Sequence, residues 1–138
     1  MATIGTTSQG ESPASTWKAS RHGFEATLER LRLAIGAEGL WLIHEIDTQG
    51  LVAREGHAIP PLRQLLFFHP RFLIRLLEEC PGALTDAPLR VIVRETPGGG
   101  VEVGHPGLSP ALGEGQGCAT MGGTLRGIYG RVVETACC

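Results

Sequence analysis

Residues 89–105 read LRVIVRETPGGGVEVGH, and this stretch decides the fold. Every second residue from Leu89 to Val93 is apolar, which is the period of a strand with one buried face. The glycines at 98–100 then lead into a second short apolar alternation at 101–103, a pattern typical of a β-hairpin. The stretch therefore predicts two antiparallel strands, at 89–95 and 101–103.

The flanking segments supply the partners of this hairpin. Phe24, Leu28, Leu31 and Ile35 are spaced four, three and four residues apart, as on one face of a helix. Apolar residues recur at helical spacing after residue 70, and the same four, three and four spacing recurs from residue 121. We expect strands at 15–20, 39–47 and 62–68, a helical turn at 51–54, and helices at 24–35, 70–80 and 121–132.

The predicted order β-α-β-β-α-β-β-α indicates an α+β fold, a two-layer sandwich with helices on one face of an antiparallel sheet. Residues 1–14 lack a hydrophobic period and are expected to form a flexible tail. We predict a single domain over 15–135, followed by a short Cys-containing C-terminal tail at 136–138. At 138 residues the chain has room for one core, and two full domains are excluded.

The composition of the chain argues against nucleic acids and membranes as its binding partners. Twelve Lys and Arg against 14 Asp and Glu leave a net charge of −2, so we expect no nucleic-acid binding. The longest apolar run is far shorter than the roughly 20 residues that cross a bilayer, and no signal peptide is recognisable, which predicts a cytoplasmic protein without membrane contact. In that setting the four cysteines are expected to stay free rather than form a disulfide framework.

Three segments together resemble the family catalogued as domain of unknown function 302. They read GFEATLERLRLAIGAEGLWLIHEID, IPPLRQLLFFHPRF and APLRVIVRETPGGGVEVGHP. The resemblance implies a compact domain with a curved antiparallel sheet, often homodimeric, and brings no reaction with it. This chain departs from the family pattern at Asp47-Thr48, at Phe68-His69-Pro70 and around His105.

Polar side chains fall at predicted strand ends, where loops present functional groups. Asp47, His69 and His105 are our candidate ligand-binding residues, in a noncatalytic homodimeric module without a cofactor. With His44 added, the same group is a plausible shell for a transition metal ion. The other interpretation is structural: His44 is a hydrogen-bonded, partly buried strand residue, while His69 and His105 shape turns before proline.

The adjacent thiols Cys137 and Cys138 support an alternative function, a sulfur- or metal-handling protein that uses this pair with the strand-end histidines. The competing interpretation is a solvated end with incidental thiols. Catalysis ranks third, because the chain has no G-x-S-x-G, H-E-x-x-H or phosphate-loop motif. No nucleophile and base can be paired from spacing alone, and no catalytic residue is predicted.

Overall fold

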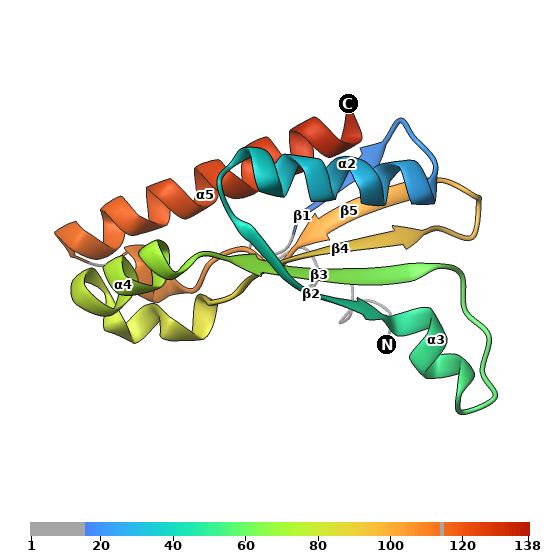
Figure 1. Cartoon of the computed structure of the whole chain (residues 1–138), viewed down its shortest axis with the longest axis horizontal. Helices are drawn as coiled ribbons and strands as arrows, with labels where there is room; N and C mark the ends of the chain where they lie inside the picture. Colours follow the sequence, from blue (N-terminus) through green and yellow to red (C-terminus); the bar gives the residue numbers. More distant parts are fainter. Residues whose placement is uncertain (1–15, 114) are drawn as a thin grey trace, which may run out of the picture.

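The computed structural model describes residues 16–113 and 115–138, so the predicted tail 1–14 lies outside the described residues. Five strands form one antiparallel sheet in the order β1-β5-β4-β3-β2 (Figure 1). This arrangement, with helices packed on the sheet, confirms the predicted α+β class. The strands are β1 (Thr16–Ser20), β2 (Trp41–Asp47), β3 (Leu62–Phe68), β4 (Leu89–Glu95) and β5 (Val101–His105).

Two long helices, α2 (Phe24–Ala37) and α5 (Gln116–Cys137), lie side by side on one face of the sheet (Figure 1). The shorter α3 (Thr48–Ala53) and α4 (Pro70–Glu79) lie toward opposite ends of the molecule. Two 3₁₀ segments that the sequence did not predict, η1 (Pro81–Asp86) and η2 (Pro110–Gly113), complete the chain.

The core lies between the sheet and these two helices. Along β4 the side chains of Leu89, Val91 and Val93 are fully buried, which confirms the alternation found in the sequence. They meet the α2 stripe Leu28, Leu31 and Ile35 and the α5 stripe Met121, Leu125, Ile128 and Val132, all nearly inaccessible to water.

Helix α5 is ten residues longer than the predicted helix at 121–132, and at least one of its glycines serves packing. A Cβ at Gly122 would lie 2.5 Å from the Leu112 carbonyl oxygen of η2, so only glycine lets the two segments approach this closely. The helix also continues through Cys137, whose side chain is buried. The predicted C-terminal tail at 136–138 is therefore replaced by the last helical turn and one further residue.

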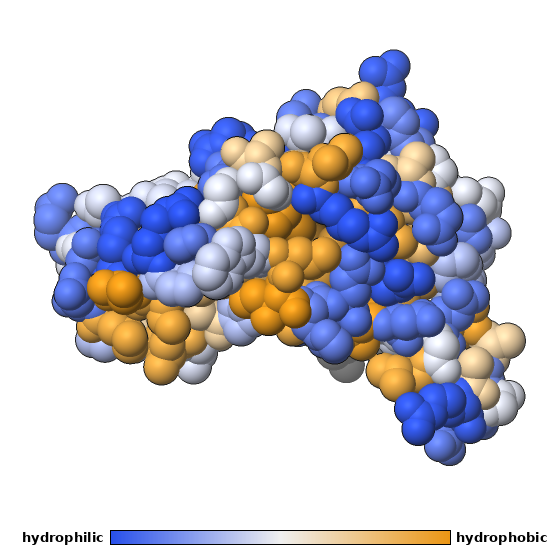
Figure 2. Space-filling model, viewed as in Figure 1, coloured by the Kyte–Doolittle hydropathy of each residue, from blue (hydrophilic) through white to orange (hydrophobic). Residues whose placement is uncertain are grey.

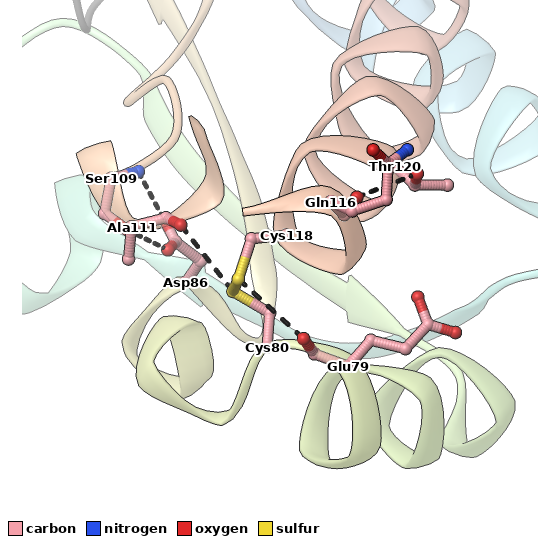
Figure 3. The surroundings of a disulfide bond; sticks show 8 residues. All are labelled: Glu79, Cys80, Asp86, Ser109, Ala111, Gln116, Cys118 and Thr120. Carbon is pink, nitrogen blue, oxygen red and sulfur yellow. Dashed lines mark hydrogen bonds between the residues drawn. A yellow bond between two sulfur atoms is a disulfide. The ribbon is translucent and has the colours of Figure 1, made fainter. Parts of the chain in front are cut away.

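A disulfide joins Cys80, just after α4, to Cys118 in the first turn of α5 (Figure 3). Their Cα atoms lie 5.0 Å apart although 38 positions separate them in sequence. The expectation that all four cysteines stay free is thus wrong for this pair. The disulfide could not be predicted from a short cysteine motif, because only the packing of α4 and η2 against α5 brings the two residues together.

Candidate functional site

The predicted ligand-binding residues lie at three separate places. Neighbouring strands of an antiparallel sheet end at opposite edges, so Asp47 at the end of β2 faces Arg63 near the start of β3. His69 follows the far end of β3, and His105 ends β5. The fold does not bring the three side chains into one pocket.

Two of these residues have local structural partners. The Asp47 carboxylate caps α3 by accepting a hydrogen bond from the Gly50 amide at 3.0 Å. His69 caps α4, with its Nδ1 accepting from the Arg71 amide at 3.1 Å, and its ring lies 4.6 Å from the Trp41 ring. His44 lies exposed on edge strand β2, beside an irregularity in the pairing with β3.

The terminal thiols do not act as a pair either. Cys137 is fully buried and directs its thiol to the Lys18 carbonyl oxygen, and burial raises the pKa of that thiol. Cys138 is exposed and contacts the Glu134 carboxylate. Within residues 16–113 and 115–138, no three His, Cys, Asp or Glu side chains gather as metal ligands.

A different site surrounds Tyr129 of α5. Two adjoining hollows, of about 520 and 560 Å³, share four lining residues: Gly107, Leu108, Pro110 and Tyr129. We refer to the two hollows together as the Tyr129 groove. Arg90 and Asp86 line the first hollow, and Thr16, His105 and Arg126 line the second. Of the predicted site residues, His105 is the one that lies here.

His105 is held on three sides. Its ring stacks on the Tyr129 ring, with centroids 4.3 Å apart and planes 10° from parallel. Its Nδ1 accepts a hydrogen bond from the Gly107 amide at 3.2 Å, so the neutral ring carries its proton on Nε2. That Nε2 lies 2.7 Å from the Thr16 hydroxyl oxygen and donates to it. Burial lowers the pKa of His105, which keeps the imidazole neutral at pH 7.

Tyr129 is equally well positioned. It is only 2% exposed, and its ring meets Phe67 edge to face. Its hydroxyl oxygen accepts a hydrogen bond from the Arg90 backbone amide at 3.0 Å. Burial raises the pKa of the phenol, so the hydroxyl keeps its proton, and that proton can be donated into the groove.

Asp86, at the end of η1, also lines the groove. Its two carboxylate oxygens accept from the amide and the hydroxyl of Ser109, at 2.9 and 2.5 Å (Figure 3). This contact ties η1 to the residues just before η2. The disulfide lies beside the same two segments, and the Cys80 sulfur also contacts the Ala111 carbonyl oxygen of η2 (Figure 3).

Sequence reasoning found His105 but missed Tyr129, Arg90 and Arg126. A signal for the histidines was present: His69-Pro70 and His105-Pro106 both place Nδ1 on the amide two residues later. Tyr129 adjoins Ile128 in an apolar helix and is therefore indistinguishable by pattern from a core residue. Its role depends on which loop the tertiary fold places beside it.

Comparisons with known proteins agree with this architecture. The model of the family described as "Domain of unknown function DUF302" matches residues 16–124. A solved structure, the crystal structure of an uncharacterized conserved DUF302 protein from Bacillus stearothermophilus, superposes with a TM-score of 0.78 at 16% identity. It covers 91% of this chain and 99% of that chain. No curated protein matches. Because the family model covers most of the sequence, this chain belongs to the DUF302 family.

Proposed function

We propose that this chain is a noncatalytic, homodimeric module that binds a small organic molecule in the Tyr129 groove. Ligand sites are typically concave, of about 300 to 1,000 Å³, with apolar walls and a few fixed polar groups. The groove has these features, and the His105–Tyr129 stack carries the proposal. Hydrogen bonds fix both histidine nitrogens and the tyrosine oxygen, so the wall is already ordered before a ligand arrives.

The protonation of His105 argues against catalysis. A hydroxyl beside an imidazole suggests a nucleophile and its general base, and the Thr16–His105 contact has that composition. A base would have to accept the hydroxyl proton on Nε2, but the Gly107 amide requires the proton to stay there. Ser109 has no imidazole partner in the described chain, since its hydroxyl donates to Asp86. The site is therefore arranged for binding.

Ligand binding is tested by native mass spectrometry of freshly purified protein and by a fragment screen followed with amide NMR shifts. We expect shifts at Gly107, Leu108 and Ser109. Leu108→Glu places a charge beside both hollows and should abolish the shifts. The matched variant Leu84→Glu, at an exposed position outside the groove, should not. A screen in which no compound shifts the groove amides of the wild-type protein would refute the proposal.

The homodimer is supported by an apolar surface that we call the β2–α4 surface. β2 is an edge strand, and its Trp41 and Ile43 are 59% and 57% exposed. Ile74 and Leu77 of α4 are also about half exposed, and Figure 2 shows apolar side chains over both elements on one face. An exposed apolar edge strand is a template for pairing with another chain. A second copy, pairing β2 with β2, would cover it.

Light scattering after size exclusion tests the dimer. We expect a mass near twice 14.7 kDa for the wild-type chain. Ile43→Lys should shift this mass to the monomer, because it places a charge in the middle of the pairing edge. Leu51→Lys on α3, where the leucine is similarly exposed, serves as the control and should leave the dimer intact. A wild-type monomer at high micromolar concentration would rule out the dimer while leaving ligand binding open.

A further inference from the structure

Two arginines of the Tyr129 groove lack partners in the described chain. Most described arginines are engaged: Arg32 and Arg63 share the Glu45 carboxylate, and Arg131 pairs with Glu38. Among residues 16–113 and 115–138, the guanidinium groups of Arg90 and Arg126 form no hydrogen bond or ion pair, and each lines one hollow of the groove. Two unpaired cations thus border one concave surface.

The other polar groups of the groove do not offset this charge. Asp86 is the only described carboxylate that lines either hollow, and both of its oxygens are already engaged with Ser109. His105 is neutral, so the described lining residues sum to one net positive charge. The hydroxyl groups also favour a ligand with acceptors, because Tyr129 and Thr16 each accept a hydrogen bond and retain a hydroxyl proton to donate. The groove therefore presents hydrogen-bond donors and positive charge. A ligand that carries hydrogen-bond acceptors and negative charge would complement it.

The walls limit which anion fits. Leu66, Pro88, Pro106, Leu108 and Pro110 line the hollows, so a bound molecule loses part of its hydration. Removing a dianion from water costs far more than removing a monoanion, and one net positive charge compensates only a single negative one. A carboxylate also matches the planar guanidinium fork.

We infer that the ligand of the Tyr129 groove is an organic monocarboxylate with an apolar body, held at its charged end by Arg126 with the Thr16 and Tyr129 hydroxyls, or by Arg90 with the Tyr129 hydroxyl. This inference rests on the proposed function, since it names the ligand class of the same site. The apolar body would lie along Leu108 and Pro110, the residues common to both hollows.

Three small probes test this inference: benzoate, the neutral isostere benzamide, and inorganic phosphate, each titrated against the wild-type protein by amide NMR. We expect benzoate to shift Leu108 and neighbouring amides with a dissociation constant at least tenfold below those of the other two. Arg90→Gln combined with Arg126→Gln should weaken benzoate at least tenfold. Arg54→Gln removes an equal charge from an exposed arginine outside the groove and should change binding less than twofold.

The outcomes separate the two proposals. Benzamide or phosphate binding as tightly as benzoate would overturn the monocarboxylate, and the groove would still be a ligand site. Benzoate binding unchanged in the double arginine variant would overturn it as well. If the double variant fails to fold, each single variant is expected to weaken benzoate against Arg54→Gln, and no effect in either contradicts the inference. Absence of shifts with these probes and with the whole fragment library would defeat the proposed function too.

Discussion

The two ends of α5 hold the same residue type in opposite chemical states. At its start, Cys118 is cross-linked to Cys80 and lies beside the segments that wall the Tyr129 groove. At its end, Cys137 is a buried free thiol packed as a small apolar residue, and noncovalent contacts secure the turn. Arg30 of α2 donates to the carbonyl oxygens of Thr135 and Ala136 at 2.9 and 3.2 Å.

This difference follows from what each end packs against. The start of α5 lies against α4 and η2, where Leu112 and Met121 are fully buried and the disulfide adds a covalent link. The end of α5 lies on α2 and β1, where Val132 and Ala136 are fully buried. A cysteine is therefore a cross-link at one end of the helix and a core residue at the other, so its sequence neighbours do not reveal its role.

Removing the disulfide should have the largest effect. In the chain-entropy account, a 38-residue separation corresponds to about 4 kcal/mol of stability. Cys80→Ser with Cys118→Ser should lower the free energy of unfolding by roughly that amount in urea titrations. Cys138→Ser is the matched control and should change it by less than about 0.5 kcal/mol. Equal stability of the wild-type protein with and without a dithiol reductant would contradict the importance assigned to the link.

Removal of the Tyr129 hydroxyl probes the groove beside that link. Tyr129→Phe keeps the ring stack but leaves the Arg90 amide without its acceptor. An unsatisfied buried donor costs about 2 kcal/mol, which should appear in the free energy of unfolding. Faster hydrogen exchange is expected at the Arg90 amide in particular. A variant with unchanged Arg90 exchange would show that the hydroxyl does not hold this strand.

The noncovalent end of α5 should be less sensitive. Arg30→Gln removes the charged donor from two terminal carbonyl groups, each at the helix end where a positive charge is favourable. We expect a loss of about 1 kcal/mol in the free energy of unfolding. Arg54→Gln, at an exposed arginine away from α5, should cost less. A larger loss than that of the double variant Cys80→Ser with Cys118→Ser would reverse the comparison between the two ends.

Acid should weaken the Tyr129 groove through His105. Burial lowers the pKa of folded His105 below the roughly 6.5 of the unfolded chain, so the unfolded state binds the proton more readily. Stability from this residue is full above pH 6.5 and declines as the pH falls from there toward the folded pKa. Protonation of Nδ1 also opposes the hydrogen bond from Gly107. His105→Gln should flatten this part of the pH profile, whereas replacement of the exposed His57 should not.

Helices and strands with a strong hydrophobic period could be predicted from the sequence. Contacts between residues far apart in the sequence could not. The alternation in β4 and the stripe in α2 each depend on one buried face, which a local pattern records directly. Strand order, η1, η2 and the full length of α5 depend on distant neighbours. The glycines of α5, for instance, lower its intrinsic helix propensity, yet Gly122 is what allows the helix to contact Leu112.

The amino-acid pattern alone was sufficient for the α+β class, the antiparallel hairpin and the family resemblance, because buried and exposed positions repeat with the period of each element. Folding in three dimensions decided that Asp47, His69 and His105 separate, that Cys80 meets Cys118, and that Tyr129 lies beside His105. These pairings join residues tens of positions apart. Their formation depends on the packing of whole elements against one another, which a one-dimensional period does not encode.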